Sequence, residues 1–231
     1  MRNLLLALFG MLLFHSTFSQ IYEYPIAAKQ SHEDLKINTI EITTEYTIIH
    51  LSITNQLNAG GWFCAGNSIL LKNSKGSEIY QLTRSENIPV CPDKYEFKSK
   101  GEVLEFILYF PPIHKDIKFL DLIENCDEAC FSFEGIILDN EHNKKILKLE
   151  QAMELYSTSR FAESVPLFKQ VLEGKQTIES QIFGLSYYYL VLSYHKINDK
   201  TNTDYWYKAL QNSTVPLKEE FIKELNLQLG Y

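Results

Sequence analysis

The sequence predicts an α+β protein in two separate domains, an N-terminal antiparallel β-sandwich and a C-terminal all-α domain of paired helices. Apolar and polar residues alternate between Ile37 and Leu138, which is the period of β-strands. From residue 144 onward, apolar residues recur at the spacing of amphipathic helices. A polar stretch, Asp139 to Asn143, separates the two patterns. We expect this stretch to act both as a linker and as the N-terminal cap of the first helix.

Residues 1–19 have the pattern of a secretory signal peptide. Arg2 precedes an apolar run over residues 4–14, which is shorter than the roughly 20 residues that a bilayer span needs. Thr17 and Ser19 are small residues suited to a peptidase site, so we predict cleavage after Ser19. The expected protein is exported, periplasmic or secreted, with no membrane insertion. Its predicted domains are 20–139, the sandwich, and 140–231, the helices.

The charge balance argues against nucleic acid as a partner. The chain has 22 Lys and Arg residues against 29 Asp and Glu residues, a formal net charge of −7. Proteins that bind nucleic acid use clustered basic side chains to neutralise phosphates. No basic run occurs after the signal peptide. We therefore expect a protein or peptide partner.

The alternating region contains short strand candidates separated by turn residues. Ile49, Leu51 and Ile53 are the apolar members of one candidate, so they should face a core, while His50 should lie on the opposite, solvated face. The other candidates are residues 68–72, 78–83, 103–110, 118–123 and 131–138. About seven short strands without a helical pattern among them favour an immunoglobulin-like sandwich, and a barrel is the alternative.

Four cysteines in this half favour disulfide bonds, because they follow an export signal. We favour Cys64 with Cys91, and Cys126 with Cys130, since the second pair lies within one short loop. A zinc site is the alternative, but the spacing of Cys126 and Cys130 is not that of a zinc-finger knuckle.

The C-terminal half repeats a register of aromatic and small residues. Residues 153–174 and 191–212 align at an offset of 38, which places Tyr156 on Tyr194 and Phe168 on Trp206. Self-similarity at a fixed period of this size is typical of stacked helical hairpins. The expected helices cover about 146–156, 161–172, 177–194 with Thr177 as its cap, 203–210, and a last one that starts at Pro216.

Residues 144–212 resemble two tetratricopeptide repeats. The resemblance rests on Leu149, Ala152, Met153 and Tyr156 in the first unit and on Trp206 and Ala209 in the second. It implies a superhelical groove that binds a basic or amphipathic peptide segment of a protein partner. The first-helix residues that it places in the groove are Glu150, Glu154, Tyr188, Leu192 and His195, with Tyr188 as the anchor.

The N-terminal half also carries a resemblance. Residues 60–64, Gly-Gly-Trp-Phe-Cys, and residues 108–112, Leu-Tyr-Phe-Pro-Pro, resemble uncharacterised domains of exported bacterial proteins. No activity comes with this resemblance. It implies only a bacterial periplasmic or secreted setting.

No local motif for catalysis is present, so we predict no catalytic residue, no cofactor and no metal site. Glu124, Asp127 and Glu128 lack the spacing of a calcium loop, and a solvated acidic turn is the simpler interpretation. Trp62 follows two glycines; it either packs on a disulfide or stacks on a ligand. The leading hypothesis is an exported, non-enzymatic binding or scaffold protein. The alternatives are an enzyme of unrecognised type and a purely structural helical appendage packed on the sandwich.

Overall fold

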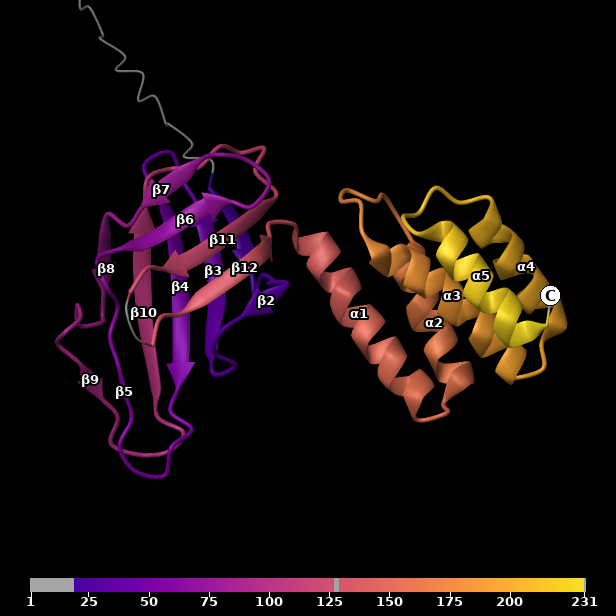
Figure 1. Cartoon of the computed structure of the whole chain (residues 1–231), viewed down its shortest axis with the longest axis horizontal. Coiled ribbons are helices and arrows are strands. Elements are labelled where there is room, and N and C mark those ends of the chain that lie inside the picture. The colour runs from indigo at the N-terminus through magenta and orange to yellow at the C-terminus, as the bar shows by residue number, and fades with distance from the viewer. Residues whose placement is uncertain (1–18, 127–128, 231) are drawn as a thin grey trace, which may run out of the picture.

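The computed structural model describes residues 19–126 and 129–230. Within these residues the chain forms a β-rich half followed by five helices (Figure 1). We call residues 19–138 the β module and residues 140–230 the helical module. The predicted signal peptide, apart from Ser19, lies outside the described residues. Among the described helices, none combines the length and the apolar composition that crossing a membrane requires.

Two antiparallel five-stranded sheets and one short ribbon make up the β module. The first sheet has the order β1 (Gln20–Glu23), β3 (Leu35–Ile42), β4 (Thr47–Thr54), β10 (Val103–Phe110) and β8 (Arg84–Glu86). The second has the order β2 (Lys29–Gln30), β12 (Ser132–Ile137), β11 (Phe119–Glu124), β6 (Ile69–Asn73) and β7 (Ile79–Gln81). The ribbon pairs β5 (Trp62–Phe63) with β9 (Tyr95–Glu96).

The two sheets share one hydrophobic core. Ile49 and Leu51 of β4 are fully buried, and so are Leu71 of β6 and Leu122 of β11. Burial alternates along β4 as predicted, because successive side chains of a strand point to opposite faces. His50 is accordingly half-buried on the outer face. The strand pattern therefore places an apolar layer between the sheets.

The helical module contains α1 (Asn140–Ser157), α2 (Phe161–Leu172), α3 (Gln181–Lys196), α4 (Lys200–Gln211) and α5 (Lys218–Leu229). The central helix α3 packs against all the others. Its three consecutive tyrosines each meet a ring of a different helix: Tyr187 contacts Trp206 of α4, Tyr188 contacts Phe221 of α5, and Tyr189 stacks on Phe168 of α2. This arrangement explains why α3 has more buried residues than any of the other four helices.

The two modules meet at the first turn of α1, and Figure 1 shows the other helices projecting away from the sheets. Asp139 is the N-cap of α1 and accepts a hydrogen bond from the backbone N–H of His142 at 2.9 Å, as predicted. The Asn140 side chain accepts from the N–H of Glu23 at 3.2 Å and donates to the carbonyl of Ile21 at 2.9 Å. The predicted linker is therefore wrong: residues 140–143 form a helical turn tied to β1.

Helix starts differ from the predictions where a cap was misassigned. The N-cap of α3 is Ser180, whereas Thr177 donates its hydroxyl to Asp139 at 2.5 Å. Helix α4 begins at Lys200 because Asp199 caps it and accepts from the N–H of Asn202. Both caps are short polar residues whose side chains satisfy the free N–H groups of a first helical turn.

The helical repeat has an offset of 39 rather than the predicted 38. Helices α2 and α4 begin at 161 and 200 and end at 172 and 211. The loops before them contain Ser159 and Asn198, both with positive φ, near 60°. The offset also superposes two buried hydroxyl residues, Ser164 and Thr203, whose side chains bond to carbonyls in the preceding turn. The sequence alignment matched large aromatic residues and so missed this register.

Candidate functional site

A cavity of about 600 Å³ opens in the β module beside the Cys64–Cys91 and Cys126–Cys130 disulfides, and we call it the disulfide cavity. Its volume lies within the range of about 300–1,000 Å³ that is typical of small-molecule sites. The apolar part of its wall is formed by Ile53, Leu57, Trp62, Phe63, Pro92 and Phe97. Four titratable side chains also line it: His32, Asp34, Lys94 and Glu124.

The loop at the mouth of the cavity is fixed by Asn55. This side chain is 5% exposed, and its amide nitrogen donates to the carbonyls of Leu57, Gly60 and Ser99. Gly61 follows with a φ of +107°, and a Cβ there would lie 2.6 Å from the Asn55 side-chain oxygen. Only glycine tolerates this combination of backbone conformation and close approach. The loop therefore holds the start of β5 in a defined position.

Trp62 lies at the cavity mouth because β5 pairs with β9. The alternation of the strand turns Phe63 inward, where it is 8% exposed, and leaves Trp62 46% exposed. The ammonium nitrogen of Lys94 lies 3.7 Å from the centre of the Trp62 ring, which is a cation–π contact. Trp62 thus lines the cavity next to a disulfide and also presents a large surface to solvent.

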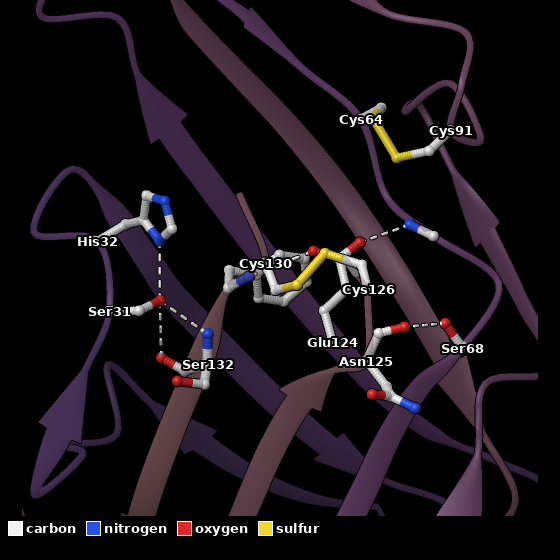
Figure 2. The surroundings of a disulfide bond; sticks show 12 residues. Ser31, His32, Cys64, Ser68, Cys91, Glu124, Asn125, Cys126, Cys130 and Ser132 are labelled. Atoms are coloured by element: carbon white, nitrogen blue, oxygen red, sulfur yellow. Dashed lines mark hydrogen bonds between the residues drawn. A yellow bond between two sulfur atoms is a disulfide. The ribbon is translucent and has the colours of Figure 1, made fainter. Parts of the chain in front are cut away.

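Both disulfides join the cysteines that the sequence favoured. Cys64–Cys91 links the segment after β5 to the loop before β9, and Cys126–Cys130 closes the turn between β11 and β12. Figure 2 shows the second bond beside Glu124. The described cysteines leave no free thiol. These cross-links limit the motion of two segments of the cavity wall relative to each other.

Glu124 is not part of a solvated acidic turn, as the sequence had suggested. It is 6% exposed, and its carboxylate accepts the backbone N–H of Gly66 at 2.6 Å and that of Phe131 at 3.2 Å (Figure 2). No ion pair of Glu124 occurs among the described residues. Asp127 and Glu128 lie outside the described part of the chain. Across the residues that are described, no three metal-ligating side chains gather.

His32 and Asp34 border the cavity from the segment between β2 and β3. The Nδ1 atom of His32 lies 2.8 Å from the Ser31 hydroxyl, and that hydroxyl accepts the N–H of Ser132 at 2.8 Å (Figure 2). The Ser31 oxygen is therefore engaged with the neighbouring strand β12. This geometry supports the pairing of β2 with β12 rather than nucleophilic attack, which needs a serine oxygen open to substrate.

The predicted groove residues Tyr188 and Leu192 face the interior. Leu192 is 4% exposed within the helical core. The Tyr188 ring lies 5.9 Å from that of Phe221, and its hydroxyl accepts a hydrogen bond from Gln228 at 2.8 Å. Helix α5 thus covers the face of α3 that the repeat register had placed in a groove. Leu192 is packed in the core of this structure, where a partner would not reach it, and the partner-binding role of the predicted set stays a prediction.

The other predicted groove residues, Glu150, Glu154 and His195, are exposed. They do not converge with Tyr188 and Leu192. At the offset of 39, the positions of Glu150 and Glu154 correspond to Tyr189 and Ser193, which pack against α2. The two glutamates therefore occupy the face of α1 where a preceding helix would pack. A polar outer face is what a terminal unit of stacked helices needs. His195 lines a separate depression with Asn198 and Lys200.

The sequence drew attention to Trp62, the cysteines and Glu124, which it placed in a solvated turn, but it did not predict a cavity. Asp34 lies far in the sequence from Lys94 and Phe97, and no local motif connects them. The pair of glycines before Trp62 was the one signal of an unusual backbone. No known family model matches this chain, and no solved structure matches it either.

Proposed function

We propose that this chain is an exported, non-enzymatic binding protein that takes its ligand in the disulfide cavity. The observation that carries the proposal is the cavity itself: about 600 Å³, mostly apolar, with Trp62 half-exposed at the mouth and a few polar groups on the wall. Such a combination is typical of small-molecule and side-chain binding sites. The ligand is an apolar or aromatic group of a small molecule or a short peptide.

We propose in addition that the β module is an immunoglobulin-like sandwich and that the helical module is of tetratricopeptide type. Two antiparallel sheets with a common core support the first assignment. Two helical hairpins, with α1 and α5 each in contact with α3, support the second. Helix α5 then takes the place of the first helix of a third unit, which is why Tyr188 is covered.

Export is supported by two disulfides and by the leader-like pattern of residues 1–19. Disulfides persist in an oxidising compartment, so we place the mature chain in the periplasm or outside the cell. In this account the helical module is a scaffold that carries the β module. Its N-terminal turn is bonded to β1, so the two modules move together at that point.

The test is a ligand screen with the full-length mature protein, followed by variants in each module. Saturation-transfer NMR would detect binding from a set of aromatic amines, alcohols, acids and blocked dipeptides. We expect hits whose signal is lost in Trp62→Ala. The matched control is Tyr205→Ala, since Tyr205 is an exposed aromatic residue of the helical module, 62% exposed. Binding that survives Trp62→Ala and disappears in Tyr205→Ala would overturn the proposal, and so would a screen without hits.

A further inference from the structure

We propose that the disulfide cavity selects organic cations of the amine class, meaning ligands with an apolar or aromatic body and a protonated amino group. This inference rests on the proposed binding function and adds the charge of the ligand. It follows from an imbalance of charge among the side chains of the cavity wall. Two carboxylates, Glu124 and Asp34, line the cavity, and neither forms an ion pair with any described residue.

The buried carboxylate of Glu124 has no partner cation among the described residues. Glu124 is 6% exposed, and each of its oxygens accepts one backbone N–H. A carboxylate oxygen has two lone pairs, so both oxygens retain acceptor capacity. Removing a negative charge from water without an opposite charge is costly, and a partner cation offsets that cost. A ligand ammonium entering the cavity supplies the missing charge.

The ring of Trp62 already attracts a cation. The Lys94 ammonium lies 3.7 Å from the ring centre, although Lys94 is an exposed residue. Ammonium groups are drawn to the negative face of an indole ring. Lys94 is therefore an internal competitor: it occupies a position that suits the ammonium of a ligand. Phe63 and Phe97 add two further aromatic rings to the wall.

The charge of the whole chain points in the same direction. A formal net charge of −7 attracts cations and repels anions over the distance of a Debye length. The competing interpretation is that Lys94 binds the carboxylate of an anionic ligand. The two interpretations make opposite predictions for removal of the Lys94 charge, which makes that variant the decisive one.

The test compares three probes of the same shape: phenylbutylammonium, phenylbutanol and phenylpentanoate. Isothermal titration of the mature protein should show the ammonium probe binding at least about tenfold more tightly than the alcohol, and the carboxylate most weakly. Lys94→Ala should strengthen binding of the ammonium by about two- to fivefold, because an exposed charge contributes on this scale. Trp62→Leu should weaken it by a similar factor.

Variants of the carboxylates complete the test. Asp34→Asn should weaken binding of the ammonium probe and leave that of phenylbutanol unchanged, whereas Glu45→Gln, which changes an exposed carboxylate outside the cavity wall, should affect neither. Glu124→Gln should act in the same way as Asp34→Asn. Because Glu124 also accepts two backbone hydrogen bonds, its result counts only if the circular dichroism and thermal midpoint of the variant stay close to those of the wild type.

The outcomes distinguish the selectivity for amines from the existence of the binding site. Equal binding of phenylbutanol and phenylbutylammonium, or weaker ammonium binding in Lys94→Ala, would overturn amine selectivity and leave the binding site intact. If none of the three probes binds, both the site and its selectivity are refuted. A blocked Phe-Lys-Ala peptide and its norleucine counterpart identify the source of the amine. Tighter binding of the lysine peptide than of the free amine assigns the site to a peptide side chain, and the reverse assigns it to a small molecule.

Discussion

The carboxylate of Glu124 accepts the backbone N–H of Gly66 at 2.6 Å and so joins the end of β11 to the segment that follows β5. Its other oxygen accepts the N–H of Phe131. One side chain therefore fixes two backbone segments at the cavity. A Cβ at Gly66 would lie 3.1 Å from the Glu124 oxygen, so a side chain there would force the carboxylate to shift.

Glu124→Ala should destabilise the β module. The variant leaves two N–H groups without their acceptor, and each unsatisfied buried group costs about 1–3 kcal/mol. We expect the free energy of unfolding in urea to fall by about 2–4 kcal/mol in total. Glu134→Ala is the control, because Glu134 is exposed and paired with the exposed Lys29, so its loss should cost under about 1 kcal/mol. Equal losses in the two variants would contradict this role of Glu124.

The two disulfides should differ in their contribution to stability. Cys64–Cys91 spans 27 residues and Cys126–Cys130 spans 4. In the chain-entropy account, the longer loop gives the larger stabilisation, about 3–4 kcal/mol against about 2 kcal/mol. Urea unfolding of the paired Cys→Ser variants checks the order. Mass spectrometry of unreduced protein from an oxidising compartment should show no free thiol, and four free thiols or bound zinc would refute the assignment.

Gly184→Ala should loosen α5 from α3. A Cβ at Gly184 would lie 2.3 Å from the ring of Phe221, so the ring and its helix must move. Overpacking of this kind costs about 1–3 kcal/mol. In a Phe221→Leu background the same change should cost clearly less, since the obstructing ring is gone. A double-mutant cycle in urea measures this coupling, and strict additivity would show that the two residues do not interact.

His142 should make the stability of the helical module dependent on pH. The residue is 3% exposed, and its ring lies 5.9 Å from that of Phe183. Burial lowers the pKa of His142, and Lys145 adds to this effect, while Asp139 opposes it. A lowered folded-state pKa means that the unfolded chain takes up the proton first. The stabilisation is therefore complete above the ordinary pKa of about 6.5 and is lost as the pH falls below it.

The measurement for His142 is the free energy of unfolding at a series of pH values between about 7.5 and 5. Wild type should lose stability toward the acidic end, and His142→Gln should lose less over the same interval. The carboxyl group of Asp139 does not contribute to the change of stability in this pH interval. Burial raises its pKa, but the hydrogen bonds from Thr177 and from the N–H of His142 outweigh this and keep the pKa below its ordinary value. Identical slopes for wild type and variant would contradict the role of His142.

The long strands and the helices were predictable because their hydrophobic periods are strong. Val103–Phe110 was predicted with the observed bounds, and the alternation of β4 gave the core residues directly. The short strands β5 and β9 were missed. Two residues are too few to show a period, and their pairing depends on contacts between distant segments.

The repeat shows how a small shift of register changes the residues that are assigned to a groove. Helical hairpins were predicted, but aligning Phe168 with Trp206 shifted the register by one residue. A shift of one residue turns a helix face by about 100°, since a helix has 3.6 residues per turn. Tyr188 and Leu192 were therefore assigned to a groove although α5 and the helical core cover them. The cavity could not be predicted either, because only the sheet topology brings Lys94 and Glu124 into the same cavity wall as Trp62.

The position of a bound ligand decides whether the disulfide cavity is the binding site. The chain has two tryptophans, Trp62 at the cavity and Trp206 in the helical module, so each module has its own indole N–H signal. In a titration of the nitrogen-labelled mature protein with phenylbutylammonium, the Trp62 indole signal should shift progressively until saturation, while the Trp206 signal stays in place. A shift of Trp206 with an unchanged Trp62 would contradict the account.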